Sequence, residues 1–125
     1  MKLYRVMKVD ADGLPMIGTR RNMLGVRPTD PTNTNPKRKF DVDAVIGSDP
    51  VLPGTKKGLS VSVATGGFQP TRDEALWEVE DDLLADFAAI PDRPPHHVLE
   101  PRRAMTLDEY QDALAATQYL WDRVP

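Results

Sequence analysis

The sequence contains no cysteine among its 125 residues, which excludes a disulfide scaffold, a zinc site with Cys ligands and a thiol nucleophile. It has no apolar run near the ~18 residues of a membrane-spanning helix, and its N-terminus lacks the apolar core and cleavage site of a signal peptide. Positive charge is not in excess, because 16 Lys and Arg face 19 Asp and Glu, which argues against nucleic acid as a partner. We therefore expect a cytoplasmic protein that leaves its cell only through a machine independent of signal peptides.

Motifs of the common enzyme classes are absent as well. The chain has no Gly-x-Gly-x-x-Gly, no phosphate-loop lysine motif and no Gly-x-Ser-x-Gly elbow, which removes support for Rossmann, kinase and hydrolase folds. Its only histidines, His96 and His97, are adjacent, and neighbouring strand residues point to opposite faces. We therefore predict no metal site. In addition, no pair of carboxylates has a spacing that singles it out for acid and base catalysis.

The length predicts one domain over residues 1–125. With 12 prolines and 8 glycines, the chain favours many short elements over a helical bundle. Alternating apolar residues and turn signals predict an α+β fold of short antiparallel strands with one packed C-terminal helix. The predicted strands are 3–9, 41–46, 58–64, 75–79 and 96–100, with a short helix over 81–87 and a long exposed loop over 19–40.

The last element is a helix that begins after Thr106 and ends at Trp121. Thr106 and Glu109 have the spacing of a capping box, in which each residue binds a free backbone N–H of the first turn. Apolar and small side chains then follow at steps of three and four, as expected for one stripe packed on a sheet. These residues are Leu107, Tyr110, Leu114, Thr117 and Trp121.

Charge is divided along the chain. The loop over 19–40 contains six basic residues and one acidic residue, whereas residues 73–92 contain eight carboxylates and no Lys or Arg. Either the two segments face each other, or the acidic segment is a binding surface for a partner protein.

Arg5 is the first candidate site residue. It alternates with Leu3 and Met7 in the first predicted strand, and a charged group on an apolar face needs a partner or a ligand. If Tyr4 and Val6 face the core instead, Arg5 is solvated. The rigid fork of donors on a guanidinium matches phosphate.

Two further strands offer polar groups. Ser60 and Ser62 share one face with Ala64, and small side chains let a ligand lie close to the backbone, although ordinary surface serines fit the same pattern. His96 shares a face with Glu100, because strand side chains repeat every two residues. One histidine can therefore face a cleft and orient a substrate hydroxyl while the other covers the outside.

Taken in order, these segments resemble a known family. The matching residues are Leu3-Tyr4-Arg5, Leu24–Pro28, Gly58-Leu59-Ser60-Val61, and His96–Pro101 followed by Met105 and the last helix. They are similar to small type VI secretion effector toxins with an ADP-ribosyltransferase-like fold, the Tse-type NAD-dependent cytotoxins. The resemblance covers nearly the whole chain and implies a single toxin domain with an ADP-ribosyltransferase-like core.

The resemblance also implies roles for individual residues. Arg5, Ser60 and His96 stand at positions that hold and cleave NAD, with Arg5 on the diphosphate, Ser60 on the nicotinamide ribose and His96 on a ribose hydroxyl. The implied NAD-binding set is Tyr4, Arg5, Arg27, Ser60, Ser62 and His96. The chain departs from the general pattern in two places. Leu59 replaces an expected threonine, and the catalytic glutamate is missing, since Glu100 is displaced towards Pro101.

The implied function is that of a bacterial toxin that cleaves NAD, as a transferase or a glycohydrolase, without a metal. Its partners would be an unknown acceptor in the cytoplasm of a target cell and a cognate immunity protein that neutralises it. The alternative is a non-catalytic interaction module, such as the partner of a toxin, which would use its acidic segment for binding.

Overall fold

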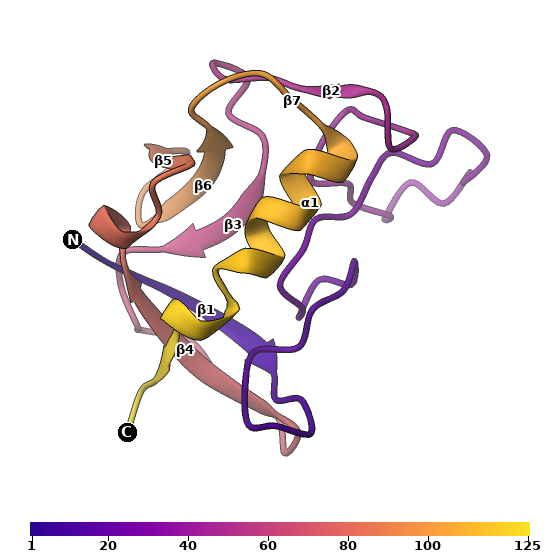
Figure 1. Cartoon of the computed structure of the whole chain (residues 1–125). Coiled ribbons are helices and arrows are strands. Elements are labelled where there is room, and N and C mark those ends of the chain that lie inside the picture. Colours follow the sequence, from indigo (N-terminus) through magenta and orange to yellow (C-terminus); the bar gives the residue numbers. More distant parts are fainter.

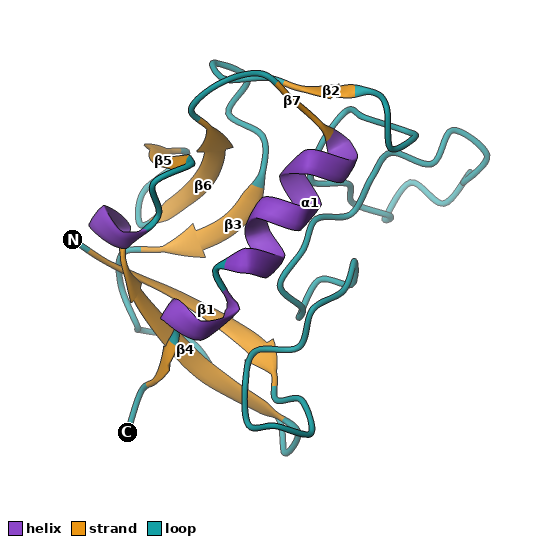
Figure 2. Cartoon of the chain, viewed as in Figure 1, coloured by secondary structure: helices purple, strands orange, loops and turns teal.

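A computed structural model describes residues 1–125 and has an α+β architecture (Figure 1). Six antiparallel strands form the main sheet in the order β5-β6-β3-β1-β4-β8, and Figure 2 shows the single α-helix lying across them. The strands are β1 (Lys2–Lys8), β3 (Leu59–Ser62), β4 (Glu74–Glu80), β5 (Phe87–Pro91), β6 (His96–Pro101) and β8 (Asp122–Arg123). A separate two-stranded ribbon joins β2 (Pro50–Val51) to β7 (Met105–Thr106).

The main sheet has a weak seam between β1 and β3. β1 pairs with β4 at all seven of its residues, and β3 pairs with β6 at all four of its own. Across the seam, by contrast, β1 and β3 share only the pair Tyr4 and Ser62. The sheet is therefore two well-paired halves that diverge on either side of one point, and this divergence leaves room for a cleft.

The helix α1 (Leu107–Ala116) packs on the sheet through the predicted stripe, all five residues of which are buried. Its capping box is present, because Glu109 N donates to the Thr106 hydroxyl while Thr106 N donates to the Glu109 carboxylate. Tyr110 is fully buried and meets Phe87 edge to face at 5.5 Å between ring centroids. Its hydroxyl donates to Leu99 O and accepts from Leu59 N, so one side chain connects α1 to both β3 and β6.

Four of the predicted strands are confirmed: those over 3–9, 58–64, 75–79 and 96–100 correspond to β1, β3, β4 and β6. The α+β class and the C-terminal helix are confirmed too, although α1 ends at Ala116 rather than at Trp121. A 3-10 helix, η2 (Gln118–Leu120), lies between the end of α1 and Trp121. The loop over 19–40 contains no helix or strand of its own and lies on the side of the molecule away from β5 and β6 (Figure 1). It is not exposed throughout, contrary to the prediction, because Leu24 and Val26 are buried in the core.

The strand predicted over 41–46 is wrong. Val42 and Ala44 are buried alternately, as the pattern required, but no neighbouring strand offers them a ladder. The backbone of this segment bonds to loops instead: Asp41 N donates to Arg27 O, and Val45 N donates to the Asp49 side chain. Alternating burial thus occurs here without a β-ladder.

The short helix predicted over 81–87 is also wrong in its extent. Only Asp81–Leu83 forms a 3-10 helix, η1, and the chain then leaves helical geometry at Leu84. Phe87 begins β5, which pairs with β6 over five residues. Pairing with a neighbouring strand therefore overrides the local helical preference that two acidic residues in the first turn, Asp81 and Asp82, suggest.

The acidic segment forms no ion pair with the cationic loop, although the two segments meet where the Asn22 side chain donates to Glu74. Its carboxylates instead form ion pairs with the first strand and the chain terminus: Lys2 with Glu78, Lys8 with Asp73, and the terminal amine with Glu80 and Asp81. The only ion pair of the cationic loop joins Arg27 to Asp41, so the other basic side chains of the loop have no ionic partner.

Candidate functional site

A cleft of about 340 Å³ lies at the seam of the sheet. Residues from β1, β3 and β6 line it, and five of the six residues of the implied NAD-binding set are among them. These are Tyr4, Arg5, Ser60, Ser62 and His96. The structure thus brings together side chains from three separate strands, and we call this space the seam cleft.

Arg5 forms part of its floor. The residue is only 9% exposed, so the interpretation that places it on the buried face of β1 is correct and the solvated alternative is wrong. Its Nη1 donates to Ser60 O at 2.9 Å, and its Nη2 donates to the carbonyl oxygens of Arg21 and Met23 at 2.8 Å each. The guanidinium therefore connects β3 to the loop beyond β1, at the point where the ladder between β1 and β3 has ended.

The electrostatics of Arg5 are unusual for a buried charge. No carboxylate forms an ion pair with it, and its Nε is buried without a hydrogen-bond partner. Burial lowers its pKa to about 10, because desolvation disfavours the charged form. The side chain still carries its positive charge at neutral pH, because three carbonyl oxygens accept its hydrogen bonds and the carboxylate of Asp41 favours the charged form from a longer distance.

The two serines differ in how free their hydroxyls are. Ser62 Oγ donates to Ala64 O at 2.8 Å and accepts from Ala64 N at 3.1 Å, so it closes a local turn. Ser60 uses its backbone oxygen for Arg5, and its hydroxyl makes no hydrogen bond within the protein. Ser60 is therefore the serine with a donor and an acceptor to offer a ligand.

His96 has a fixed ring orientation. Its Nδ1 lies 3.0 Å from the backbone oxygen of Asp92 and 3.4 Å from the carboxylate of the same residue. When the ring is neutral, these acceptors favour the proton on Nδ1, which leaves Nε2 as a free acceptor. His97 is buried and faces the Pro95 carbonyl. The two histidines point in different directions, as strand geometry predicts, but the prediction that the second histidine covers the outside is wrong.

Asp92 was missed by the sequence-based interpretation. The turn between β5 and β6 brings it back onto the histidine four positions later. The sequence does contain a signal, because Asp92 is the one acidic residue that precedes a basic residue by four positions, but this spacing brings side chains together in a helix and does not by itself predict a contact across a turn.

Glu100 is not part of the seam cleft. It is buried, and its two carboxylate oxygens accept from the backbone N–H groups of Gly54 at 2.8 Å and Lys56 at 2.7 Å. Its role is therefore to hold a turn. The carboxylate that does line the cleft is Glu74, whose pKa is lowered by the backbone N–H of Thr71 and by the Asn22 side chain.

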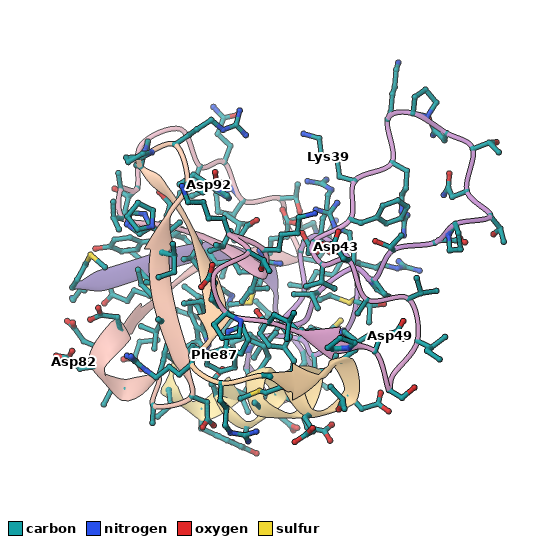
Figure 3. All side chains as sticks on the ribbon, turned by 90° about the horizontal axis from the view of Figure 1, so that it is seen from above. Lys39, Asp43, Asp49, Asp82, Phe87 and Asp92 are labelled. Carbon is teal, nitrogen blue, oxygen red and sulfur yellow. The ribbon has the colours of Figure 1, made fainter.

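A second space of about 280 Å³ adjoins the seam cleft, and the two share Ser60 and His96 as lining residues. We call it the cationic hollow, because five basic side chains line it: Arg27, Lys39, Lys56, Lys57 and Arg93. Figure 3 shows Lys39 and Asp92, which both line it, on the side of the sheet away from α1.

Arg27 is the one member of the implied NAD-binding set that lies outside the seam cleft. It lines the cationic hollow and donates from N, Nε and Nη2 to the carboxylate of Asp41 at 2.7–3.0 Å. This pairing raises the pKa of Arg27. Arg27 also lines a third space of about 400 Å³, together with Arg20, Arg21 and Arg38.

No group of three or more His, Cys, Asp or Glu side chains is arranged to hold a metal ion. None of the helices has the length and apolar character needed to cross a membrane. No family model matches the chain, and comparisons with curated proteins and with solved structures gave no significant match.

Proposed function

We propose that the protein is a bacterial toxin that binds NAD in the seam cleft and breaks its nicotinamide–ribose bond. The observation that carries this proposal is the meeting of Tyr4, Arg5, Ser60, Ser62 and His96 in one cleft. The resemblance to ADP-ribosyltransferase-like toxins implies that these five residues bind NAD, and that resemblance uses only the sequence. A sheet that separates into two halves around the cleft supports an ADP-ribosyltransferase-like core.

The chemistry needs positioning more than strong acid or base catalysis. The C–N bond between ribose and nicotinamide breaks, its electron pair leaves with a neutral nicotinamide, and the ribose becomes oxocarbenium-like. Preoriented polar groups stabilise such a state effectively in a partly closed site. Ser60 Oγ and His96 Nε2 are the two free groups on β3 and β6 that can bind ribose hydroxyls, and Tyr4 with Phe68 offers aromatic surface for the nicotinamide ring.

The geometry changes the role that we assign to Arg5. Both of its terminal nitrogens already donate to main-chain carbonyls, so we assign it to shaping the cleft rather than to clamping the diphosphate. The cleft lacks a carboxylate from β6, because Glu100 is committed to its turn. The proposal therefore includes two reactions, transfer of the ADP-ribosyl group to an acceptor and hydrolysis of NAD by water.

The biological setting follows from the same proposal. Such a toxin acts in the cytoplasm of a target bacterium, arrives through a secretion system that reads no signal peptide, and requires an immunity protein in the cell that makes it. An unshielded NAD-degrading cleft would otherwise harm its own producer.

The deciding experiment follows viability and NAD content after induction of the chain in a bacterium. Ser60→Ala and His96→Ala should each abolish toxicity and NAD loss, and the double variant should be little worse than either, because both act on one transition state. Ser48→Ala, which removes an exposed hydroxyl outside these cavities, is the matched control. A folded His96→Ala protein that stays fully toxic would contradict the proposal, as would a wild type that neither harms cells nor binds NAD at millimolar concentration.

The second candidate is a non-catalytic interaction module, such as the partner of a toxin. The burial of Glu100 favours it, because no carboxylate from β6 is left to assist transfer. Exposed carboxylates around η1 would then form the binding surface. This module would bind a protein without changing NAD levels, so the same induction experiment separates the two candidates.

A further inference from the structure

The cationic hollow has far more positive than negative charge available. Its lining holds five basic side chains and two carboxylates, those of Asp41 and Asp92. Asp41 is fully engaged by Arg27, and Asp92 faces His96. The only other ion pair of the lining joins Lys57 to the exposed Asp43.

Three cations of the lining therefore have no ionic partner: Lys39, Lys56 and Arg93. They come from three separate segments, namely the loop before residue 41, the turn after β2 and the turn between β5 and β6. Like charges gathered around one space repel each other, and a bound anion removes that repulsion.

The backbone supports the same conclusion. Lys56 and Arg93 have φ angles of +55° and +54°, and they are the only non-glycine residues in the chain with positive φ. A residue with a Cβ is strained there, and such strain gathers at binding sites. Glu100 stabilises one of these turns by accepting the N–H of Lys56 with a buried carboxylate. A basic residue thus occupies each strained position beside the hollow.

We propose that the cationic hollow is a phosphate-binding site, with Lys39, Lys56 and Arg93 as its charged ligands and the Arg27–Asp41 pair as a rigid wall. The identity of the phosphate rests on the proposed function, although the positive charge of the hollow does not. Two sources of phosphate fit it: the diphosphate of a dinucleotide whose ribose lies at Ser60, or a phosphate group on the acceptor. Both would lie next to His96, because this histidine lines the hollow and the seam cleft alike.

A phosphate acceptor would account for the missing carboxylate. In that reaction a phosphate oxygen forms the bond to the ribose carbon while the C–N bond breaks, and the electron pair leaves with nicotinamide. Phosphate is already anionic at neutral pH, so no general base has to remove a proton. An alcohol acceptor, by contrast, needs a base at that position.

The test begins with titration of inorganic pyrophosphate into the wild type and into the double variant Lys56→Asn/Arg93→Asn. Asparagine removes the charge and tolerates positive φ better than most residues. The control is Arg102→Asn/Arg103→Asn, which removes the same charge from exposed residues outside the hollow. We expect the first variant to bind pyrophosphate at least about tenfold more weakly, as the loss of a charge-assisted contact predicts, and the control to bind like wild type.

Nicotinamide riboside and NAD distinguish the two sources. If the dinucleotide supplies the phosphate, the variant loses affinity for NAD but keeps its affinity for nicotinamide riboside, which has no phosphate. If the acceptor supplies it, affinity for both is unchanged and only pyrophosphate binding falls. A wild type that binds pyrophosphate but neither nicotinamide compound would support the hollow and overturn the proposed NAD function.

A measurement on the wild type keeps the proposal testable if the variant does not fold. Added pyrophosphate should shift the amide resonances of Lys56 and Arg93 and leave those of Arg102 and Arg103 in place. Absence of binding to the wild type, or equal binding by the wild type and a folded variant, would overturn the proposal.

Discussion

Replacing Arg5 by lysine tests whether this side chain holds the two halves of the sheet. Three carbonyl oxygens, those of Ser60, Arg21 and Met23, accept from its two terminal nitrogens. A lysine keeps the charge but brings one nitrogen on a differently shaped stem. It cannot reach both Ser60 on β3 and the two carbonyls of the loop in the same way, so the connection across the seam should be lost.

The magnitude follows from the bonds that disappear. A hydrogen bond to a charged group contributes about 1.5–3 kcal/mol, and a buried carbonyl left without a donor adds a desolvation penalty. Losing one or two of the three bonds therefore predicts a loss of about 3 kcal/mol in the free energy of unfolding. The ammonium is also more strongly hydrated than a guanidinium, which makes its burial less favourable.

Urea unfolding followed by tryptophan fluorescence measures this loss, because Trp77 and Trp121 are both buried. Arg20→Lys is the control, since it makes the same exchange at an exposed position. NAD affinity should fall in Arg5→Lys and stay unchanged in Arg20→Lys. If the two variants unfold at the same urea concentration and bind NAD alike, Arg5 neither connects the sheet nor shapes the cleft.

Three further outcomes are expected. Trp121→Ala should cost about 3–5 kcal/mol through lost burial and a cavity, because the residue is 3% exposed and its Nε1 donates to Thr117. An unchanged melting temperature would show that the stripe is not packed. Burial raises the pKa of Tyr110 above its ordinary value of 10.0, so the free energy of unfolding should fall as pH rises above that value. Tyr110→Phe should remove this part of the pH dependence. Denaturation of both proteins between pH 9 and pH 11 measures the difference. Glu100→Gln should cost about 1–3 kcal/mol, since an amide nitrogen would face an N–H donor, and should weaken pyrophosphate binding by loosening the turn at Lys56; equal binding would separate that turn from the phosphate site.

The elements that the sequence predicts well are those with strong local signals. α1 has a capping box and a regular apolar stripe, so its start and its buried face are predictable from neighbouring residues. β1 and β3 show clear alternation, and burial follows it. The segment over 41–46 alternates as well, but a strand also needs a partner with a free edge, and no local pattern reports whether one exists.

The candidate site also has features that the sequence predicts and features that only the tertiary structure determines. Resemblance and alternation placed Arg5, Ser60 and His96 on faces that meet in the cleft. They did not predict that the Arg5 guanidinium would be engaged by backbone carbonyls, because those carbonyls belong to segments 16 to 55 positions away. The sequence does not predict the positive φ of Lys56 and Arg93 either, because basic residues have no preference for that conformation and only the tertiary structure imposes it.

The seam also determines what resists a change in the width of the cleft. Within the sheet, one Cα pair and one guanidinium join the two halves, so most of the resistance to a relative rotation of the halves comes from the hydrophobic core that they share with α1. A ligand that touches β1 and β3 together restricts this rotation and is opposed by the entropy that it removes. Amide hydrogen exchange would report it as slower exchange on both sides of the cleft in the bound state, at residues that make no contact with the ligand.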